Sequence, residues 1–159
     1  MMDVPGITIV EMPHGAAAWR EAVKLRERIL RAPLGLEFSP EELAAESGDL
    51  HLGAFEAVTG AVIGCLVLSP VEGKPGACRM RQVAVTESRR EEGIGAALVM
   101  RAEVFAAARG FREMTLHARE SVAGFYERLG YAAEGSPFVE VTIPHRAMRK
   151  TLEAPTESG

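Results

Sequence analysis

Long hydrophobic runs are missing from this chain of 159 residues, although 47% of its residues are hydrophobic. No apolar stretch approaches the roughly 18 residues that a membrane-spanning helix requires. The N-terminus also lacks the charged and then apolar layout of a signal peptide. These absences predict a cytoplasmic protein, and the hydrophobic content suits one core in a single domain.

Cysteine is scarce, because the chain contains only Cys65 and Cys78. Both fall on predicted neighbouring strands, where the register of a hairpin could place them opposite one another. In a reducing compartment we expect two buried free thiols rather than a disulfide.

Excess positive charge and several common functional motifs are also absent. The net charge of −4 gives no reason to expect a nucleic-acid partner. The chain has no G-x-S-x-G and no H-E-x-x-H, and its only Gly-Lys pair is followed by Pro75, so the Walker pattern fails. The four histidines are too scattered in the sequence to suggest a zinc site. We therefore expect no metal.

The most informative segment is R-R-E-E-G-I-G-A, residues 89–96, hereafter the glycine loop. It joins a strand-like run, Met80–Val85, to a segment in which apolar residues recur at helical spacing. Gly93 and Gly95 remove side chains where the amides of a helix N-terminus would point outward. A phosphate could therefore approach these amides and the positive end of the helix dipole.

Charged residues of both signs surround these glycines. Arg89 and Arg90 add positive charge, whereas Glu91 and Glu92 favour the helix dipole but oppose a dianion. Affinity for a phosphate would then depend on the two arginines. The alternative is a glycine-rich turn that merely packs a helix.

A second motif, A-G-F-Y-E-R-L-G-Y, lies downstream at residues 123–131. The two motifs, in this order and at this separation, resemble those of the GNAT superfamily of N-acetyltransferases. Arg90–Gly95 matches its R/Q-x-x-G-x-G/A pattern, and Phe125–Tyr131 matches its F-Y-x-x-L-G-F/Y pattern. The segment V-T-I-P-H-R-A-M, residues 141–148, is similar to the I-P-H-x-x-M ending of the ElaA-type subgroup.

The resemblance covers roughly residues 7–152 and implies one N-acetyltransferase domain. The composition of residues 153–159 predicts a disordered tail. It implies a single-domain α/β GNAT fold, with a mixed central sheet of about six to seven strands flanked by about four helices. Periodicity and turn signals predict strands at 7–10, 51–56, 61–69, 78–85, 113–118, 131–134 and 139–151. They predict helices at 16–31, 40–45, 94–109 and 122–129, with Ser39 and Glu42 forming a capping box.

The resemblance also implies acetyl-CoA as the co-substrate. The diphosphate suits the glycine loop, and the pantetheine amides can pair with a strand edge as an added strand would. The expected cofactor-binding residues are Val83, Ala84, Val85, Arg89, Arg90, Gly93, Ile94, Gly95, Ala96 and Tyr126.

Tyr126 is the best candidate for a proton donor to the departing CoA thiolate, because a phenol is neutral at pH 7. The alternative is a tyrosine that covers the edge of the core beside Phe125. An amine must also lose a proton before it attacks, and Glu140 and His145 are the candidate bases. His51, His117, Glu37 and water are further options, and each side chain could instead be structural.

Arg119 ends the predicted fifth strand and could bind an acidic substrate group bidentately, or form a simple salt bridge. Together with Glu37 and His117 it makes up the expected substrate-binding set.

We therefore expect an N-acetyltransferase that moves an acetyl group from acetyl-CoA to a primary amine of a small molecule or peptide, by direct attack in a ternary complex. The alternative is a non-catalytic CoA-binding sensor or interaction module with the same fold. Tyr126 favours the enzyme, whereas Glu91 and Glu92 keep the alternative open. A homodimer is left open, and neither nucleic acid nor a membrane is expected as a partner.

Overall fold

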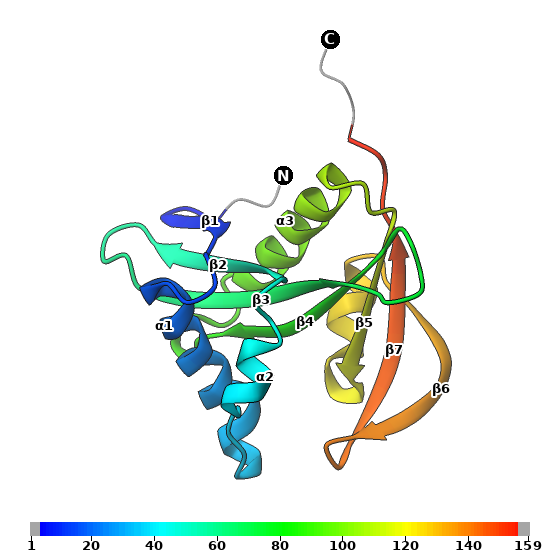
Figure 1. Cartoon of the computed structure of the whole chain (residues 1–159), viewed down its shortest axis with the longest axis horizontal. Coiled ribbons are helices and arrows are strands. Elements are labelled where there is room, and N and C mark those ends of the chain that lie inside the picture. Colours follow the sequence, from blue (N-terminus) through cyan, green and yellow to red (C-terminus); the bar gives the residue numbers. More distant parts are fainter. Residues whose placement is uncertain (1–3, 156–159) are drawn as a thin grey trace. The chain divides into compact units, whose positions relative to one another are not determined.

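The computed structural model describes residues 4–155, and within them it has seven strands and four α-helices (Figure 1). The strands are β1 Ile7–Glu11, β2 Leu50–Glu56, β3 Val62–Pro70, β4 Ala77–Val85, β5 Glu113–Arg119, β6 Ala132–Glu140 and β7 Ile143–Thr151. The helices are α1 Ala17–Arg26, α2 Pro40–Ala44, α3 Ile94–Ala108 and α4 Ala123–Arg128. This order of elements confirms the predicted α/β fold.

The strands form one sheet in the order β1-β2-β3-β4-β5-β7-β6. Strands β1, β2 and β3 pair antiparallel, as do β5, β7 and β6, whereas β4 pairs parallel with β5. The sheet is therefore mixed, as predicted. No helix within residues 4–155 is long and apolar enough to cross a membrane.

The chain divides into two compact units that are described separately below. The first unit contains the chain up to Ser69 together with Gln82–Ala102. The second unit contains Pro70–Arg81 and the chain from Glu103 onward.

In the first unit, α1 packs its apolar side against the sheet. Trp19, Ala22 and Leu25 of α1 form a buried cluster with Cys65 of β3 and Ala84 of β4. Figure 1 shows α1 and α2 on one side of β2 and β3. The helical spacing of these apolar residues explains why this face is buried.

The first turns of α3 pack against the other side of β3. A Cβ built on Gly64 would lie 2.9 Å from Leu98 Cδ1 and 3.4 Å from Ile94 Cγ2. A larger residue at position 64 would displace these side chains, so glycine permits the close packing of helix and strand.

The predicted helix at 16–31 does not remain α-helical to its end. The α-helix stops at Arg26, and Glu27–Arg31 continues as a π-helical turn. The carboxylate of Glu27 accepts a hydrogen bond from Phe38 N at 2.9 Å, and the Arg31 guanidinium lies 4.2 Å from the Phe38 ring. The π-helical turn thus contacts Phe38, which lies later in the chain. Local periodicity cannot predict such contacts.

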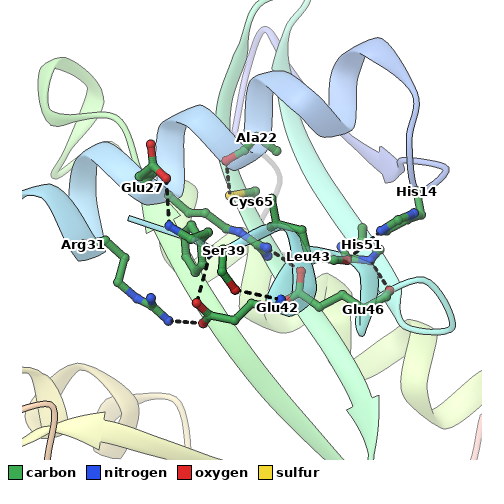
Figure 2. A network of polar contacts seen from close by, with 12 residues as sticks. His14, Ala22, Glu27, Arg31, Ser39, Glu42, Leu43, Glu46, His51 and Cys65 are labelled. Carbon is green, nitrogen blue, oxygen red and sulfur yellow. Dashed lines mark hydrogen bonds and ion pairs between the residues drawn. The ribbon is translucent and has the colours of Figure 1, made fainter. Parts of the chain in front are cut away.

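The capping box at the start of α2 is confirmed. Ser39 Oγ accepts from Glu42 N at 3.1 Å, and the Glu42 carboxylate accepts from Ser39 N at 3.1 Å (Figure 2). Both bonds satisfy amides that the helix itself leaves unpaired.

In the second unit, the predicted boundary between the last two strands is wrong. Strand β6 runs to Glu140, and Val141 and Thr142 form the turn before β7, with φ of 50° and 63°. Such a turn ordinarily carries Asn and Gly, so the sequence contains no recognisable signal for it. Strand β6 is also continuous through Gly135 and Pro137, with a register shift between Glu134 and Phe138.

Two further predictions concern cysteine and the tail. Cys65 and Cys78 are both buried and free, which confirms the expected thiols. Residues 153–155 belong to no helix or strand, and the remainder of the predicted disordered tail lies outside the described residues.

Candidate functional site

The last three residues of β4, Val83–Val85, lie past the point where β4 pairs with β5. The parallel register runs from Ala77↔Glu113 to Arg79↔Thr115. Gln82 then adopts φ 56°, which is uncommon for a non-glycine residue and is typical of a bulge in a strand. Residues 83–85 thus follow a distortion of the strand, at the position where the sequence predicts binding of the pantetheine amides.

The glycine loop enters α3 with amides that the helix does not use. Glu91 has φ 69° and Gly93 has φ 84°, so the chain turns sharply twice before the helix. The first helical bond runs from Ala97 N to Gly93 O at 3.0 Å. The amides of Ile94, Gly95 and Ala96 therefore have no partner within the helix, as expected for an anion-binding helix start.

The two arginines of the loop differ in their contacts. Arg89 Nε donates to both carboxylate oxygens of Glu92 at 2.9 Å, and Arg89 Nη1 donates to Glu56. Two carboxylates thus neutralise much of the charge of Arg89. The side chain of Arg90 is exposed, so Arg90 is the loop cation that an incoming anion would meet first.

In the second unit, Glu140 lies between two imidazoles. Its Oε2 is 3.5 Å from His117 Nδ1 and 3.8 Å from His145 Nε2. The Phe138 ring meets His117 edge-on at 4.9 Å and stacks on His145 at 6.0 Å between ring centroids. We call Arg79, His117, Phe138, Glu140 and His145 the histidine cluster.

Pairing of three strands brings the cluster together. Phe138 of β6 lies opposite His145 of β7, and His145 lies opposite Arg119 of β5. His117 is two residues before Arg119 and therefore points to the same face of the sheet. Three residues that the sequence predicts separately, His117, Glu140 and His145, are thus close in space.

The hydrogen bonds of the two imidazoles fix different tautomers. Arg79 Nη2 donates to His117 Nδ1 at 2.7 Å, which places the His117 proton on Nε2. Burial, and then the positive charge of Arg79, lower the pKa of His117, so this imidazole is neutral at pH 7. His145 Nδ1 instead donates to the carbonyl of Ile143 at 2.7 Å, so in the neutral imidazole the lone pair lies on Nε2, the nitrogen nearer Glu140.

Tyr126 lies on α4, with 8% of its surface exposed. Its ring meets Phe125 at 5.0 Å and Tyr131 at 5.9 Å between centroids. Burial raises the pKa of Tyr126 to about 12, so the phenol keeps its proton at neutral pH. The tyrosine is therefore a packed side chain and also a competent hydrogen-bond donor.

Helix α4 and the histidine cluster lie on opposite faces of the strands. Lys150 Nζ donates to the carbonyl of Leu129, just past α4, at 2.8 Å. Lys150 and His145 are five positions apart on β7, so their side chains leave opposite faces. Tyr126 and His145 therefore lie on opposite faces of these strands.

Two other predicted site residues belong to the first unit. Glu37 belongs to the first unit and is exposed. His51 is also in the first unit and is buried, and its Nε2 bonds to the carbonyl of Glu46 at 2.9 Å (Figure 2). This contact connects His51 to the segment after α2.

The sequence reasoning missed Arg79 and Phe138. Strand alternation could have placed Arg79 on an outer face of β4, because its neighbours Cys78 and Met80 are apolar. Its approach to His117 depends on the pairing of β4 with β5, and the position of Phe138 depends on the turn at Val141, so no local signal indicates either contact.

Comparisons with known proteins agree with this fold. The model of the acetyltransferase (GNAT) family matches residues 19–131. The uncharacterised N-acetyltransferase YitI of Bacillus subtilis is 32% identical over 141 residues, which is 83% of this chain and 91% of YitI.

Two crystal structures share the fold. Aminoglycoside 6'-N-acetyltransferase complexed with coenzyme A has a TM-score of 0.76 and 18% identity, covering 94% of this chain and 99% of that one. ElaA of Escherichia coli has a TM-score of 0.76 and 14% identity, covering 91% and 99%. The likeness to ElaA supports the fold and does not by itself assign the subgroup. The family model matches more than half of this chain, and YitI is more than 30% identical to it. This chain therefore belongs to the GNAT family of acetyltransferases.

Proposed function

We propose that this protein transfers the acetyl group of acetyl-CoA to a primary amine of a small molecule or peptide, by direct attack in a ternary complex. Membership of the GNAT family supports acetyl transfer. The observation that carries the finer proposal is the position of His145 Nε2 beside Glu140, while Nδ1 of the same ring bonds to the carbonyl of Ile143.

His145 is the proposed general base. An alkylamine is mostly protonated at neutral pH and must lose a proton before it attacks. His145 Nε2 accepts that proton, and the carboxylate of Glu140 at 3.8 Å stabilises the imidazolium that forms. His117 cannot take this role through Nδ1 while Arg79 donates to that nitrogen.

Direct attack is favoured over an acyl-enzyme because neither cysteine is an activated nucleophile. Burial raises the pKa of the Cys65 thiol to about 12, and Cys78 is also buried. A neutral thiol is a weak nucleophile, so the amine itself attacks the thioester carbon. A C–N bond forms, the C–S bond breaks, and the sulfur leaves with its electron pair.

Tyr126 is the proposed donor to the leaving sulfur. A free thiol has a pKa of roughly 8.5, well below the value of about 12 for Tyr126. Burial raises the pKa of a thiol as well as that of a phenol. A CoA thiol in a buried site therefore has a pKa closer to that of Tyr126 than a free thiol has. The phenol therefore stabilises the thiolate first through a hydrogen bond and can then protonate it.

Acetyl-CoA is the proposed co-substrate, with its diphosphate on the glycine loop and its pantetheine arm along Val83–Val85. The unused amides of Ile94, Gly95 and Ala96 and the exposed Arg90 support the first contact. The Arg89–Glu92 pair supports it too, because this pair removes part of the negative charge that the loop would present to a dianion.

The test measures CoA release with a panel of primary amines. The variant His145→Gln keeps a polar side chain but cannot accept a proton, so kcat should fall about 10²- to 10⁴-fold, with acetyl-CoA binding unchanged by calorimetry. His14→Gln, in the first unit, is the matched control and should retain full turnover.

Normal turnover of the His145→Gln variant would remove His145 from the mechanism. Tight binding of acetyl-CoA without CoA release for any amine would favour the non-catalytic CoA-binding module instead.

A further inference from the structure

Two tyrosines pack against each other at the end of α4. Tyr126 and Tyr131 are 8% and 3% exposed, and their rings meet edge to face with 5.9 Å between centroids. The carbonyl of Tyr126 accepts hydrogen bonds from Tyr131 N at 3.1 Å and from Leu129 N at 3.0 Å. The ring and the backbone of Tyr126 therefore both depend on the position of Tyr131 and of the turn before it.

The two phenol groups differ in their partners. Tyr131 OH donates to Glu103 Oε2 of α3 at 2.8 Å. Burial, and then the negative charge of Glu103, raise the pKa of Tyr131, so this phenol keeps its proton and its hydrogen bond at neutral pH. Among residues 4–155, the hydroxyl of Tyr126 has no hydrogen-bond partner. Tyr131 is thus anchored by its hydroxyl, whereas the hydroxyl of Tyr126 is available to a ligand.

Lys150 of β7 completes these contacts. Its Nζ donates to Glu103 Oε1 at 2.9 Å and to the carbonyl of Leu129 at 2.8 Å. The same Nζ lies 5.6 Å from the centroid of the Tyr131 ring. The Glu103 side chain is only 15% exposed, so solvent and salt screen this ion pair less than one on the open surface. Gly130 permits the approach of Lys150, because a Cβ at position 130 would lie 3.2 Å from Lys150 Cε.

We call Glu103, Tyr131 and Lys150 the anchor network, which joins α3, the turn after α4 and β7. We propose that these three are positioning residues for Tyr126, and that they hold its ring so that the hydroxyl meets the CoA sulfur. This inference rests on the proposed function. A hydrogen bond to the leaving group depends on distance and direction, so a small shift of the end of α4 weakens it.

The first test removes the hydroxyl of Tyr131 and keeps its ring. The pattern F-Y-x-x-L-G-F/Y contains Phe at this position, so we expect Tyr131→Phe to fold. Its kcat for CoA release should fall about three- to tenfold, with affinity for acetyl-CoA unchanged by calorimetry. Glu103→Leu should cause at least the same loss. Glu103→Gln still accepts hydrogen bonds and should restore part of the activity.

A double-mutant cycle separates positioning from general destabilisation. In the Tyr126→Phe background the proposed donor is absent, so Tyr131→Phe should have no further effect on kcat. Equal losses in both backgrounds would overturn the inference, because a change that only loosens the fold acts on both alike. Glu113→Gln is the matched control in the same unit: it removes the charge paired with Lys74 and Arg149 and should leave kcat unchanged in both backgrounds.

A second readout does not need turnover. The chain has only two tyrosines, so tyrosine labelled with ¹³C at Cζ gives two NMR signals, and Tyr131→Phe identifies the signal of Tyr126. Addition of CoA should shift the Tyr126 signal in the wild type and in Glu113→Gln, and should shift it less in Glu103→Leu. An equal shift in Glu103→Leu would contradict the positioning role.

Failure of this inference is distinguishable from failure of the proposed donor. A reduced kcat for Tyr126→Phe with a normal kcat for Tyr131→Phe would overturn only the positioning role and leave the proposed function standing. A normal kcat for Tyr126→Phe, or no shift of the Tyr126 signal when CoA is added to the wild type, would remove Tyr126 from the proposed mechanism and the positioning role with it.

Discussion

Two histidines beside one carboxylate have different hydrogen-bond partners, and we therefore propose different chemical roles for them. His117 accepts from a guanidinium, whereas His145 donates to a carbonyl. In its neutral form, the first imidazole therefore carries its proton on Nε2, whereas the second carries its lone pair there. Residue type alone would not distinguish them, since both are histidines on adjacent strands of one sheet.

The role of Tyr126 can be tested by removing its hydroxyl. Tyr126→Phe keeps the ring and its contacts with Phe125 and Tyr131, but removes the proposed donor to the CoA sulfur. We expect kcat to fall at least about tenfold, since general acids typically contribute 10² to 10⁴. Single-turnover CoA release measures this loss.

Binding of acetyl-CoA and the melting temperature of Tyr126→Phe should hardly change, because one hydroxyl contributes on the order of 1 kcal/mol. Normal turnover with a lowered melting temperature would show that Tyr126 only packs against its neighbours.

His51 makes the stability of the protein depend on pH. Burial lowers the pKa of His51 in the folded state, so below roughly pH 6.5 the unfolded chain binds more protons than the folded one. The free energy of unfolding should therefore fall as the pH drops from 7 to 5. The slope is at most about 1.4 kcal/mol per pH unit for one group.

His51→Gln keeps an N–H donor for the Glu46 carbonyl but does not titrate. Urea unfolding at pH 7 and pH 5 should show a smaller difference for this variant than for the wild type. Equal differences would mean that protonation of His51 does not oppose folding.

At the scale of elements, the β6–β7 hairpin contains an unfavourable turn. Val141 and Thr142 both have positive φ, which is costly for β-branched residues and natural for Asn-Gly. Replacing both, as Val141→Asn with Thr142→Gly, should raise the free energy of unfolding by about 1–2 kcal/mol. Val58→Asn, at an exposed valine without positive φ, is the control and should change it by less than about 0.5 kcal/mol.

Turnover of the hairpin variant should be retained, because Asn-Gly favours the same turn and keeps Glu140 and Ile143 in register. A loss of stability would contradict the assignment of backbone strain to this turn.

The start of α3 is the second element whose role can be tested. Gly95→Glu adds bulk and negative charge beside the unused amides of the helix, so calorimetry should detect no acetyl-CoA binding. Val104→Glu adds the same charge at an exposed position of α3 and should bind acetyl-CoA normally. Unchanged affinity in a folded Gly95→Glu variant would exclude the glycine loop as the diphosphate site.

At the scale of the whole molecule, cofactor binding and base catalysis should be separable. The glycine loop belongs to the first unit and the histidine cluster to the second. Acetyl-CoA at 100 times its Kd should stabilise the fold by about 2.7 kcal/mol. For a chain of this size that corresponds to a rise in Tm of about 5–10 °C.

Differential scanning fluorimetry should show this rise for the wild type and for His145→Gln, and no rise for Gly95→Glu. A smaller rise for His145→Gln would indicate that the histidine cluster contributes to cofactor binding.

Local sequence determined most of the elements of this protein. The capping box, the strand before the glycine loop and the helix after it follow from side-chain chemistry over a few neighbouring residues. The two glycine-containing motifs were sufficient to identify the family, because their residue types and separation are specific in combination. The resemblance to this family implied the order of the helices and strands.

Tertiary structure determined which residues meet in the histidine cluster and where the strands around it begin and end. The turn at Val141 and Thr142 carries no turn residues, and its conformation is imposed by pairing of β6 with β7. That register places Glu140 beside His117 and His145, and the pairing of β4 with β5 places Arg79 beside His117. Contacts between residues distant in sequence depend on strand pairing, so a local pattern can name the candidate groups but cannot determine which of them meet.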